Sequence, residues 1–285
     1  MRNAKDVGGR PSWLRVSIPG GESLSRVDRL MARRGLHTVC QEAHCPNIYE
    51  CYAAGTATFL ILGEVCSRRC GFCAVSKGTP APVDSEEPAE IARAAAAMEL
   101  RHVVVTSVNR DDLRDEGAGQ FALTLEALAR ELPAATTEVL TPDFRREPEH
   151  GLETVLAARP TIFSHNLETV RRLYPGVRPG SNYDASLALL AAACARQGGS
   201  WVKSSLILGL GEREEEIRSA IGDLHDAGVR RLSLGQYLSP SHRHIPVKRY
   251  YTPGEFRELG DLARELGFEK VESAPLVRSS YHAEA

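Results

Sequence analysis

Short apolar runs alternate with helix-forming segments along most of the chain after residue 58. Several of the runs are too uniformly apolar to face water on one side, which is typical of parallel strands buried on both faces. Between them, helical spacing recurs, as in Ile217, Ile221 and Leu224. A capping box, Thr252 to Glu255, predicts where the last helix begins. The six predicted strands are Phe59–Gly63, His102–Val108, Glu138–Thr141, Thr161–Ser164, Val202–Leu208 and Arg231–Leu238.

Six strand–helix units predict an α/β fold with a parallel sheet. Right-handed crossovers leave a doubly wound sheet or a barrel-like sheet. No G-x-G-x-x-G follows the first predicted strand, and Gly209-Leu210-Gly211 is too short to be that dinucleotide-binding motif. We therefore expect a partial (β/α)6 barrel with N- and C-terminal extensions. Its active site would lie in the loops that follow the carboxyl ends of the strands.

The expected domain organisation has three parts. Residues 1–58 form an N-terminal extension, residues 59–269 the barrel, and residues 270–285 a C-terminal segment that returns to it. No stretch approaches the roughly 18 apolar residues of a membrane span, and Met1–Val16 lacks the apolar centre of a secretory signal. We therefore expect a cytoplasmic protein with no membrane partner.

The balance of charged residues indicates which classes of partner the chain can bind. The chain has 35 basic and 37 acidic residues, which argues against a nucleic-acid-binding protein. Basic residues nevertheless predominate in the first 40 positions. That segment is either a solvated extension or a docking arm for an acidic partner.

Six of the seven cysteines fall in two groups of three. Clustered cysteines in a cytosolic protein are more typical of metal ligands or catalytic groups than of disulfides. The group Cys66, Cys70 and Cys73 follows the first predicted strand closely, so it occupies the catalytic end of the barrel. Three thiolates suit an iron–sulfur cluster with one open iron. The alternative is a structural zinc ion with a fourth ligand from elsewhere.

The other group, Cys40, Cys45 and Cys51, precedes the first predicted strand. Two groups so close in the sequence suggest two clusters that face a shared cavity. The spacing alone does not distinguish iron from zinc.

The seventh cysteine, Cys194, stands apart in a helical segment. Leu187, Leu190 and Ala191 precede it at the spacing of one helix face. This pattern predicts a buried core thiol rather than a ligand.

Together with motifs elsewhere, these cysteines resemble the lipoyl synthase family of radical S-adenosylmethionine (SAM) enzymes. C-x3-C-x2-C matches the radical SAM signature, and C-x4-C-x5-C matches the additional group of that family. The resemblance extends from Trp13 to Ala283. The other motifs that carry it are Gly55-Thr-Ala-Thr-Phe59, Cys73-Ala-Val75, Pro142-Asp-Phe-Arg145, His165-Asn-Leu-Glu-Thr-Val170, Val177-Arg-Pro-Gly180, Leu234-Gly-Gln-Tyr-Leu238 and Arg278-Ser-Ser-Tyr-His-Ala283.

The resemblance implies two [4Fe–4S] clusters and SAM as cofactors. The ligands of the SAM-binding cluster would be Cys66, Cys70 and Cys73. The ligands of the auxiliary cluster would be Cys40, Cys45, Cys51 and Ser280. The residues that contact SAM would be Phe72, Asn109, Ile207 and Glu212. Among these, Phe72 would help to seat the adenine and Ile207 would give it an apolar contact.

The implied activity is the insertion of two sulfur atoms, at C6 and C8 of an octanoyl group on a carrier-protein lysine, with the auxiliary cluster as sulfur donor. An unactivated methylene offers no proton to a base, so the reaction needs a radical that the cofactor supplies. The implied partners are octanoylated lipoyl-carrier domains of a 2-oxoacid dehydrogenase E2 or a glycine cleavage H protein. An electron donor such as ferredoxin or flavodoxin and an iron–sulfur carrier that rebuilds the cluster are implied as well.

Five positions depart from the family pattern. Asn109 stands where Asp is usual, Glu116 stands in a usual Gly-Gly pair, and Ser164 replaces Asn. Ser205 and Ala274 replace glycines. None is an expected cluster ligand, so the departures bear on SAM affinity and substrate fit rather than on the class of chemistry. The alternatives are a divergent relative acting on a related acyl chain, another radical SAM enzyme with an auxiliary cluster, and a zinc-stabilised binding module.

Overall fold

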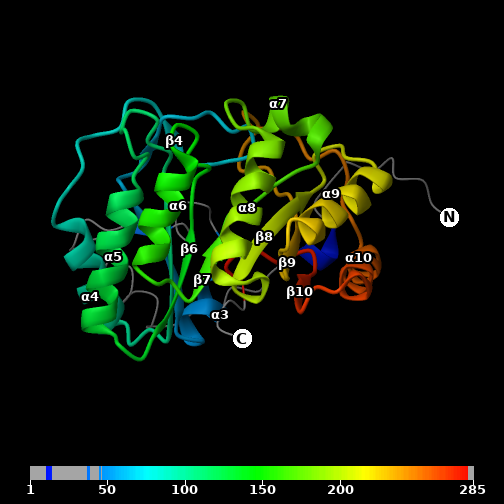
Figure 1. Cartoon of the computed structure of the whole chain (residues 1–285). Helices are drawn as coiled ribbons and strands as arrows, with labels where there is room; N and C mark the ends of the chain where they lie inside the picture. Colours follow the sequence, from blue (N-terminus) through cyan, green and yellow to red (C-terminus); the bar gives the residue numbers. More distant parts are fainter. Residues whose placement is uncertain (1–10, 15–36, 39–44, 46, 282–285) are drawn as a thin grey trace. The chain divides into compact units, whose positions relative to one another are not determined.

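The computed structural model describes residues 11–14, 37–38, 45 and 47–281 (Figure 1). The chain divides into two compact units, each described by itself. Among the described residues, the first unit comprises 37–38, 45, 47–69 and 74–164, and the second comprises 11–14, 70–73 and 165–281. The segment that holds Cys66, Cys70 and Cys73 therefore passes from the first unit into the second.

The first unit is built on a sheet in the order β1-β2-β5-β6-β7. The four longer strands run parallel, and β1 pairs with β2 antiparallel. A separate parallel pair, β3 and β4, carries the start of the cysteine segment. The strands are β1 His37–Thr38, β2 Thr56–Ile61, β3 Val65–Cys66, β4 Ser76–Lys77, β5 His102–Ser107, β6 Thr136–Leu140 and β7 Ile162–Ser164.

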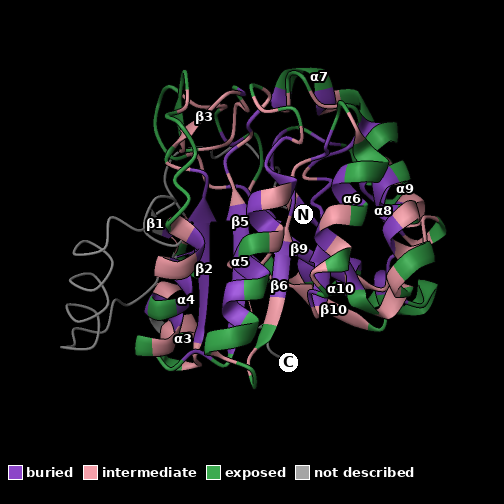
Figure 2. Ribbon diagram, turned by 60° about the vertical axis from the view of Figure 1, so that its left-hand side comes forward, coloured by how far each residue is buried: buried purple, intermediate pink, exposed green. Residues whose placement is uncertain are grey.

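Helices α4 and α5 lie side by side in this unit, and α6 packs on α5 (Figure 1). Every residue of β2 is buried, and Figure 2 shows buried strands beside helices whose outer faces are exposed. Phe59, Val104 and Phe121 are among the fully buried residues of this core. The helices are α3 Ile48–Ala53, α4 Glu87–Ala97, α5 Ala118–Glu131 and α6 Pro148–Ala157.

The second unit holds three parallel strands, β8 Val202–Leu208, β9 Arg231–Gln236 and β10 Lys270–Ser273. The predicted capping box begins α10, since Thr252 Oγ1 accepts from the Glu255 N–H at 3.2 Å and Glu255 Oε2 accepts from the Thr252 N–H at 2.8 Å. The α-helices are α7 Tyr174–Val177, α8 Tyr183–Gln197, α9 Glu214–Asp226 and α10 Pro253–Leu266. Short 3₁₀ turns are η1 Ser12–Leu14, η2 Arg171–Leu173 and η3 Gly199–Trp201.

All six predicted strands are present, with ends shifted by a few residues. The first begins at Thr56, inside the predicted N-terminal extension. Strand β10 was not predicted, because its residues are only half-buried and form no apolar run. The division into residues 1–58, 59–269 and 270–285 stays a prediction. No helix in the described part of the chain has the length and apolar character needed to span a membrane.

Candidate active site

The chain leaves β2 through a left-handed turn. Leu62 and Gly63 have φ values of 67° and 88°. Glu87, at the start of α4, accepts hydrogen bonds from the backbone N–H groups of Leu62 at 2.9 Å and Gly63 at 3.4 Å. The turn is thereby fixed where the chain enters the cysteine segment, at the carboxyl end of β2.

Cys66 lies against the loop that follows β5. The backbone N–H of Asn109 donates to Cys66 Sγ at 3.3 Å, and Asn109 Oδ1 lies 3.9 Å from the same sulfur. In return, the Ser67 N–H donates to the Asn109 carbonyl at 3.1 Å. Asn109, a predicted cofactor contact, is therefore adjacent to a predicted cluster ligand.

A buried arginine holds the cysteine segment to two strand ends. The Arg68 side chain is 4% exposed and pairs with Asp111 at 2.7 Å and Asp143 at 2.7 Å, in the loops after β5 and β6. Burial alone would raise the pKa of Asp111, but hydrogen bonds from Arg68 and Ser67 keep it below its usual value. Removing one partner from a buried pair typically costs 3–5 kcal/mol, because the other charge is left uncompensated.

Sequence reasoning missed this ion-pair cluster, which we call the Arg68 cluster. It comprises Arg68, Asp111, Asp143 and Glu116, the last with a carboxylate oxygen 3.9 Å from Arg68 Nη2. The available signal was an arginine between two cysteines and an aspartate shortly after each of two predicted strands.

Glu116 is the weakest member of the Arg68 cluster. Its side chain is 2% exposed, its φ of 49° is in the left-handed region, and burial raises its pKa. Such a backbone conformation favours glycine, which fits the Gly-Gly pattern from which Glu116 departs.

Glu116→Gln should raise the free energy of unfolding at pH 7 by about 1 kcal/mol, because a neutral amide avoids a buried charge. The native state holds the Glu116 proton more tightly than the unfolded chain does. The protonated Glu116 side chain therefore contributes to the free energy of unfolding. This contribution is complete below pH 4.5, the ordinary pKa of glutamate, and is lost as the pH rises through the raised pKa of Glu116 in the native state. In thermal unfolding from pH 4 to 8, the midpoint temperature of Glu116→Gln should therefore exceed that of wild type by an amount that grows with pH. Glu131→Gln, at the exposed end of α5, is the control; an equal gain there would contradict the assignment.

In the second unit, Cys70 and Cys73 form a turn in which the Cys73 N–H donates to the Cys70 carbonyl at 3.3 Å. Gly71 anchors it by donating to the Val177 carbonyl at 2.9 Å and accepting from the Ile245 N–H at 3.1 Å. A Cβ atom at Gly71 would lie 2.6 Å from the end of the Ile245 side chain, so a larger residue at position 71 would make that side chain shift.

The turn carries Phe72 into the same apolar cluster as Ile207, which lies near the end of β8. The buried members are Val177, Leu210, Tyr237 and Val247. Phe72 and Ile207 are only half-buried, so part of each stays available to a planar apolar ligand. The structure thus brings together the two residues expected to contact adenine.

Glu212 shapes the turn after β8. Its carboxylate accepts hydrogen bonds from the backbone N–H groups of Gly209 and, at 2.9 Å, Leu210. Gly209 has a φ of 115°, and a Cβ there would lie 2.3 Å from Gln236 Nε2. Glu212 thereby organises the turn beside Ile207, while its own contact with SAM stays a prediction.

Asn166 and Glu168, which sequence reasoning did not single out as site residues, form a polar pair beside β8. Asn166 Nδ2 donates to Glu168 Oε1 at 3.0 Å, and the Ile207 N–H donates to the Glu168 carbonyl at 2.8 Å. Burial raises the pKa of Glu168, against the attraction of Arg178, and its φ is 67°. Asn166 Oδ1 is buried without a hydrogen-bond partner among the described residues. A carboxylate on a residue with a left-handed backbone, next to an oxygen without a hydrogen-bond partner, suits a hydroxyl-bearing ligand such as SAM.

Of the predicted auxiliary ligands, Cys40 lies outside the described residues. Cys45 and Cys51 belong to the first unit, where Cys51 is in α3. Ser280 belongs to the second unit, in a turn after β10 closed by a 3.0 Å hydrogen bond from the Tyr281 N–H to the Arg278 carbonyl.

Within the described residues, no three His, Cys, Asp or Glu side chains converge on a point that could hold one metal ion. A cuboidal cluster binds each thiolate to a different iron, so its ligands need not converge in this way.

The prediction that Cys194 is a core thiol was wrong. Helix α8 buries Leu189, Leu190 and Ala193, while Cys194 is half-buried, so the buried face is offset from the predicted one. Burial nevertheless raises the pKa of Cys194 to about 11, which disfavours a reactive thiolate.

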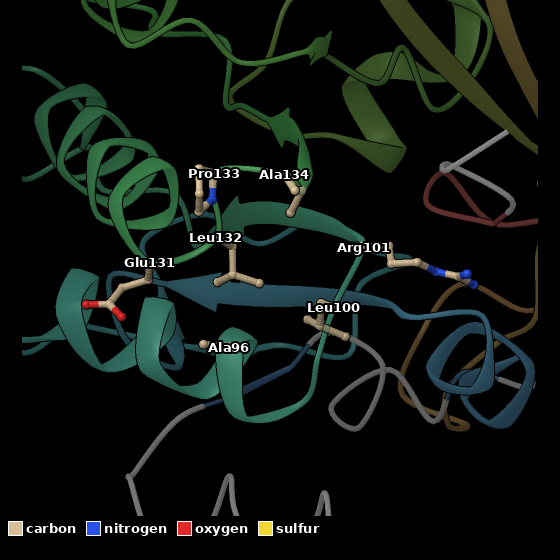
Figure 3. A pocket seen from close by; sticks show the side chains of 8 residues that line it. Ala96, Leu100, Arg101, Glu131, Leu132, Pro133 and Ala134 are labelled. Atoms are coloured by element: carbon tan, nitrogen blue, oxygen red, sulfur yellow. The ribbon is translucent and has the colours of Figure 1, made fainter.

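The cavities at the amino ends of the strands do not belong to this site. One of about 260 Å³ lies where the chain enters β5 and β6, with Leu100 and Leu132 on its wall and Glu131 and Arg101 at opposite ends (Figure 3). Another, of about 460 Å³, adjoins Cys194 ahead of β8 and β9. Both open at the edge of their sheet opposite to the loops that carry the candidate site.

Comparison with known proteins identifies the family. Residues 60–224 match the radical SAM superfamily. A lipoyl synthase of Methylococcus capsulatus is 54% identical over 275 residues, which cover 96% of this chain and 85% of the relative. One of Rubrobacter xylanophilus is 52% identical over 283 residues, covering 99% and 88%. Coproporphyrinogen III oxidase of Escherichia coli, a radical SAM enzyme, aligns with a TM-score of 0.54 at 14% identity, over 83% of this chain and 60% of that one.

The structural likeness confirms the predicted α/β fold of the radical SAM type. The family match also confirms the predicted cofactors, SAM and [4Fe–4S] clusters. With about half of its residues identical to those of curated relatives over nearly its full length, the chain belongs to the lipoyl synthase family of radical SAM enzymes.

Proposed function

We propose that this protein inserts two sulfur atoms, at C6 and C8 of an octanoyl group on a lysine of a carrier protein, and so makes lipoyl-lysine. The observation that carries the proposal is the second-unit site, where the Cys70–Cys73 turn and β8 contribute Phe72 and Ile207 to one apolar cluster. The full-length similarity to lipoyl synthases supports the choice of substrate.

The cofactors have a defined place in this proposal. The SAM-binding cluster is held by Cys66, Cys70 and Cys73. The auxiliary cluster, which donates the sulfur, is held by Cys40, Cys45, Cys51 and Ser280. When bound, SAM and its cluster supply a carbon-centred radical that can take a hydrogen atom from an unactivated methylene.

The protein's own residues bind SAM and hold the cysteine segment in position. Phe72 and Ile207 provide apolar contacts for the adenine of SAM. Asn166 and Glu168 offer an acceptor and a carboxylate to its hydroxyl groups, next to Ile207. Arg68 keeps the segment after Cys66 fixed on the loops that follow β5 and β6. Such fixed positioning matters because a misplaced radical reacts with the wrong bond.

The partners follow from the chemistry. The substrates are octanoylated carrier domains, either of a 2-oxoacid dehydrogenase E2 or of a glycine cleavage H protein. A ferredoxin or flavodoxin supplies electrons, and an iron–sulfur carrier rebuilds the auxiliary cluster. A cytoplasmic location is part of the proposal, because thiolate ligands need a reducing compartment.

The test is anaerobic incubation of reconstituted protein with SAM, dithionite and an octanoyl-lysine peptide, followed by mass spectrometry. The peptide should gain two sulfur atoms, and free octanoate, the control substrate, should gain none. SAM cleavage without sulfur gain would instead indicate another radical SAM reaction, and a protein that binds zinc but no iron would indicate a binding module.

A further inference from the structure

Asn109 faces the sulfur of Cys66 with both its backbone and its side chain. The backbone N–H donates to Sγ at 3.3 Å, and the side-chain amide lies 3.9 Å from it through Oδ1. Amide oxygen and nitrogen exchange places by a half-turn of the terminal torsion. When Cys66 is a thiolate it has no proton to donate, so the amide is expected to turn its NH₂ group toward the sulfur.

Hydrogen bonds through Ser67 also fix the position of Asn109. Its carbonyl accepts from the Ser67 N–H at 3.1 Å, and Ser67 Oγ, which donates to Asp111 Oδ2 at 2.7 Å, lies 2.9 Å from the same carbonyl oxygen. The hydroxyl of Ser67 also accepts from the Asp111 N–H at 3.1 Å. Because the two loops are joined by this set of hydrogen bonds, the N–H of Asn109 is held toward Sγ before any cofactor binds.

The ionic groups nearby pair with one another and not with Asn109. Arg68 pairs with Asp111 and Asp143, and Asp111 also has Arg145 at 3.5 Å. Glu116, 3.9 Å from Arg68, has its pKa raised by burial. Asn109 is a neutral residue whose backbone N–H contacts Cys66 Sγ, and it precedes Asp111 by two positions. A carboxylate at position 109 would add one negative charge beside the sulfur.

We propose that Asn109 raises the reduction potential of the cluster that Cys66 binds, by donating hydrogen bonds to Sγ and by keeping negative charge away from it. Hydrogen bonds to cluster sulfurs and nearby charge both shift cluster potentials, because the reduced state is the more negative one. The inference rests on the proposed function through one point, that Cys66 is an iron ligand. The step is a one-electron reduction by dithionite, which is oxidised, and no bond at Cys66 forms or breaks.

The test compares wild type with Asn109→Asp and Asn109→Ala, each as the full chain carrying its clusters. The electron paramagnetic resonance signal that changes on addition of SAM identifies the relevant cluster, and its intensity is recorded against the solution potential. Asn109→Asp should lower the ratio of reduced to oxidised cluster about tenfold at a fixed potential, equivalent to about 59 mV. Asn109→Ala keeps the backbone donor and should give a smaller shift in the same direction.

The matched control is Asn182→Asp, the same change at the exposed N-cap of α8, which should leave the potential unchanged. Equal potentials in wild type and both Asn109 variants, with the SAM-responsive signal present, would overturn the inference and leave the proposed function standing. A wild-type protein with no SAM-responsive signal would overturn both. If Asn109→Asp fails to bind its cluster, the potential of Asn109→Ala is compared with that of wild type, and equal values would overturn the inference.

Discussion

Alanine at Cys66, Cys70 or Cys73 is expected to reduce 5′-deoxyadenosine formation from SAM to the background rate. In the proposed site each of these three thiolates would bind one iron, so the loss of one ligand should remove the cluster that would bind SAM. Cys194 cannot replace a lost ligand, because it lies near the end of α8, ahead of the amino end of β8. The measurement is chromatography of the products after anaerobic incubation with SAM and dithionite.

Alanine at Cys40, Cys45 or Cys51 is expected to have a different effect. These variants should still cleave SAM, yet the octanoyl peptide should gain no sulfur, because the auxiliary cluster is its source. Cys194→Ala is the control and should keep both reactions. If the Cys45 variant inserts sulfur at the normal level, the auxiliary cluster is not the sulfur source. If the Cys66 variant cleaves SAM, Cys66 is not a ligand of the first cluster.

The strands and the cysteine groups could be predicted because their signals are local. An apolar run such as Val103–Val105 between polar segments identifies a buried strand without knowledge of its neighbours. Strand β10 gave no such signal, since each of its four residues is half-buried. Its place beside β9 depends on tertiary packing, which a local pattern does not encode.

The parts of the site that were missed depend on residues far apart in the sequence. Arg68 meets Asp111 and Asp143 only because β5 and β6 are adjacent strands whose loops emerge at the same edge. The sequence contains all three residues but not their pairing. Glu212 illustrates a second limit, because the resemblance indicates that it contacts SAM while the structure shows its carboxylate bound to the backbone of its own turn.

Ser280→Cys is expected to retain the auxiliary cluster and SAM cleavage but to stall after the first sulfur insertion. A serine oxygen is a harder and weaker ligand for a cluster iron than a thiolate. The auxiliary cluster would have to lose an iron as it gives up sulfur, and an oxygen ligand such as Ser280 would release that iron more readily than a thiolate would. Ser280 is half-buried in the turn after β10, so the proposed ligand lies on a short segment rather than inside a strand or helix.

The neighbouring serine provides a matched control for this prediction. Ser279→Cys places a thiol in the same turn, one residue away, and should leave both insertions unchanged. Ser280→Ala should bind its auxiliary cluster less tightly and make less product. Comparing the two variants separates the loss of a ligand, in Ser280→Ala, from its replacement by a stronger one, in Ser280→Cys. Mass spectrometry of the peptide separates the singly from the doubly substituted product. If Ser280→Cys completes both insertions at the normal rate, release of iron by a weak ligand is not part of the reaction, and Ser280 contributes only to the fold of its turn.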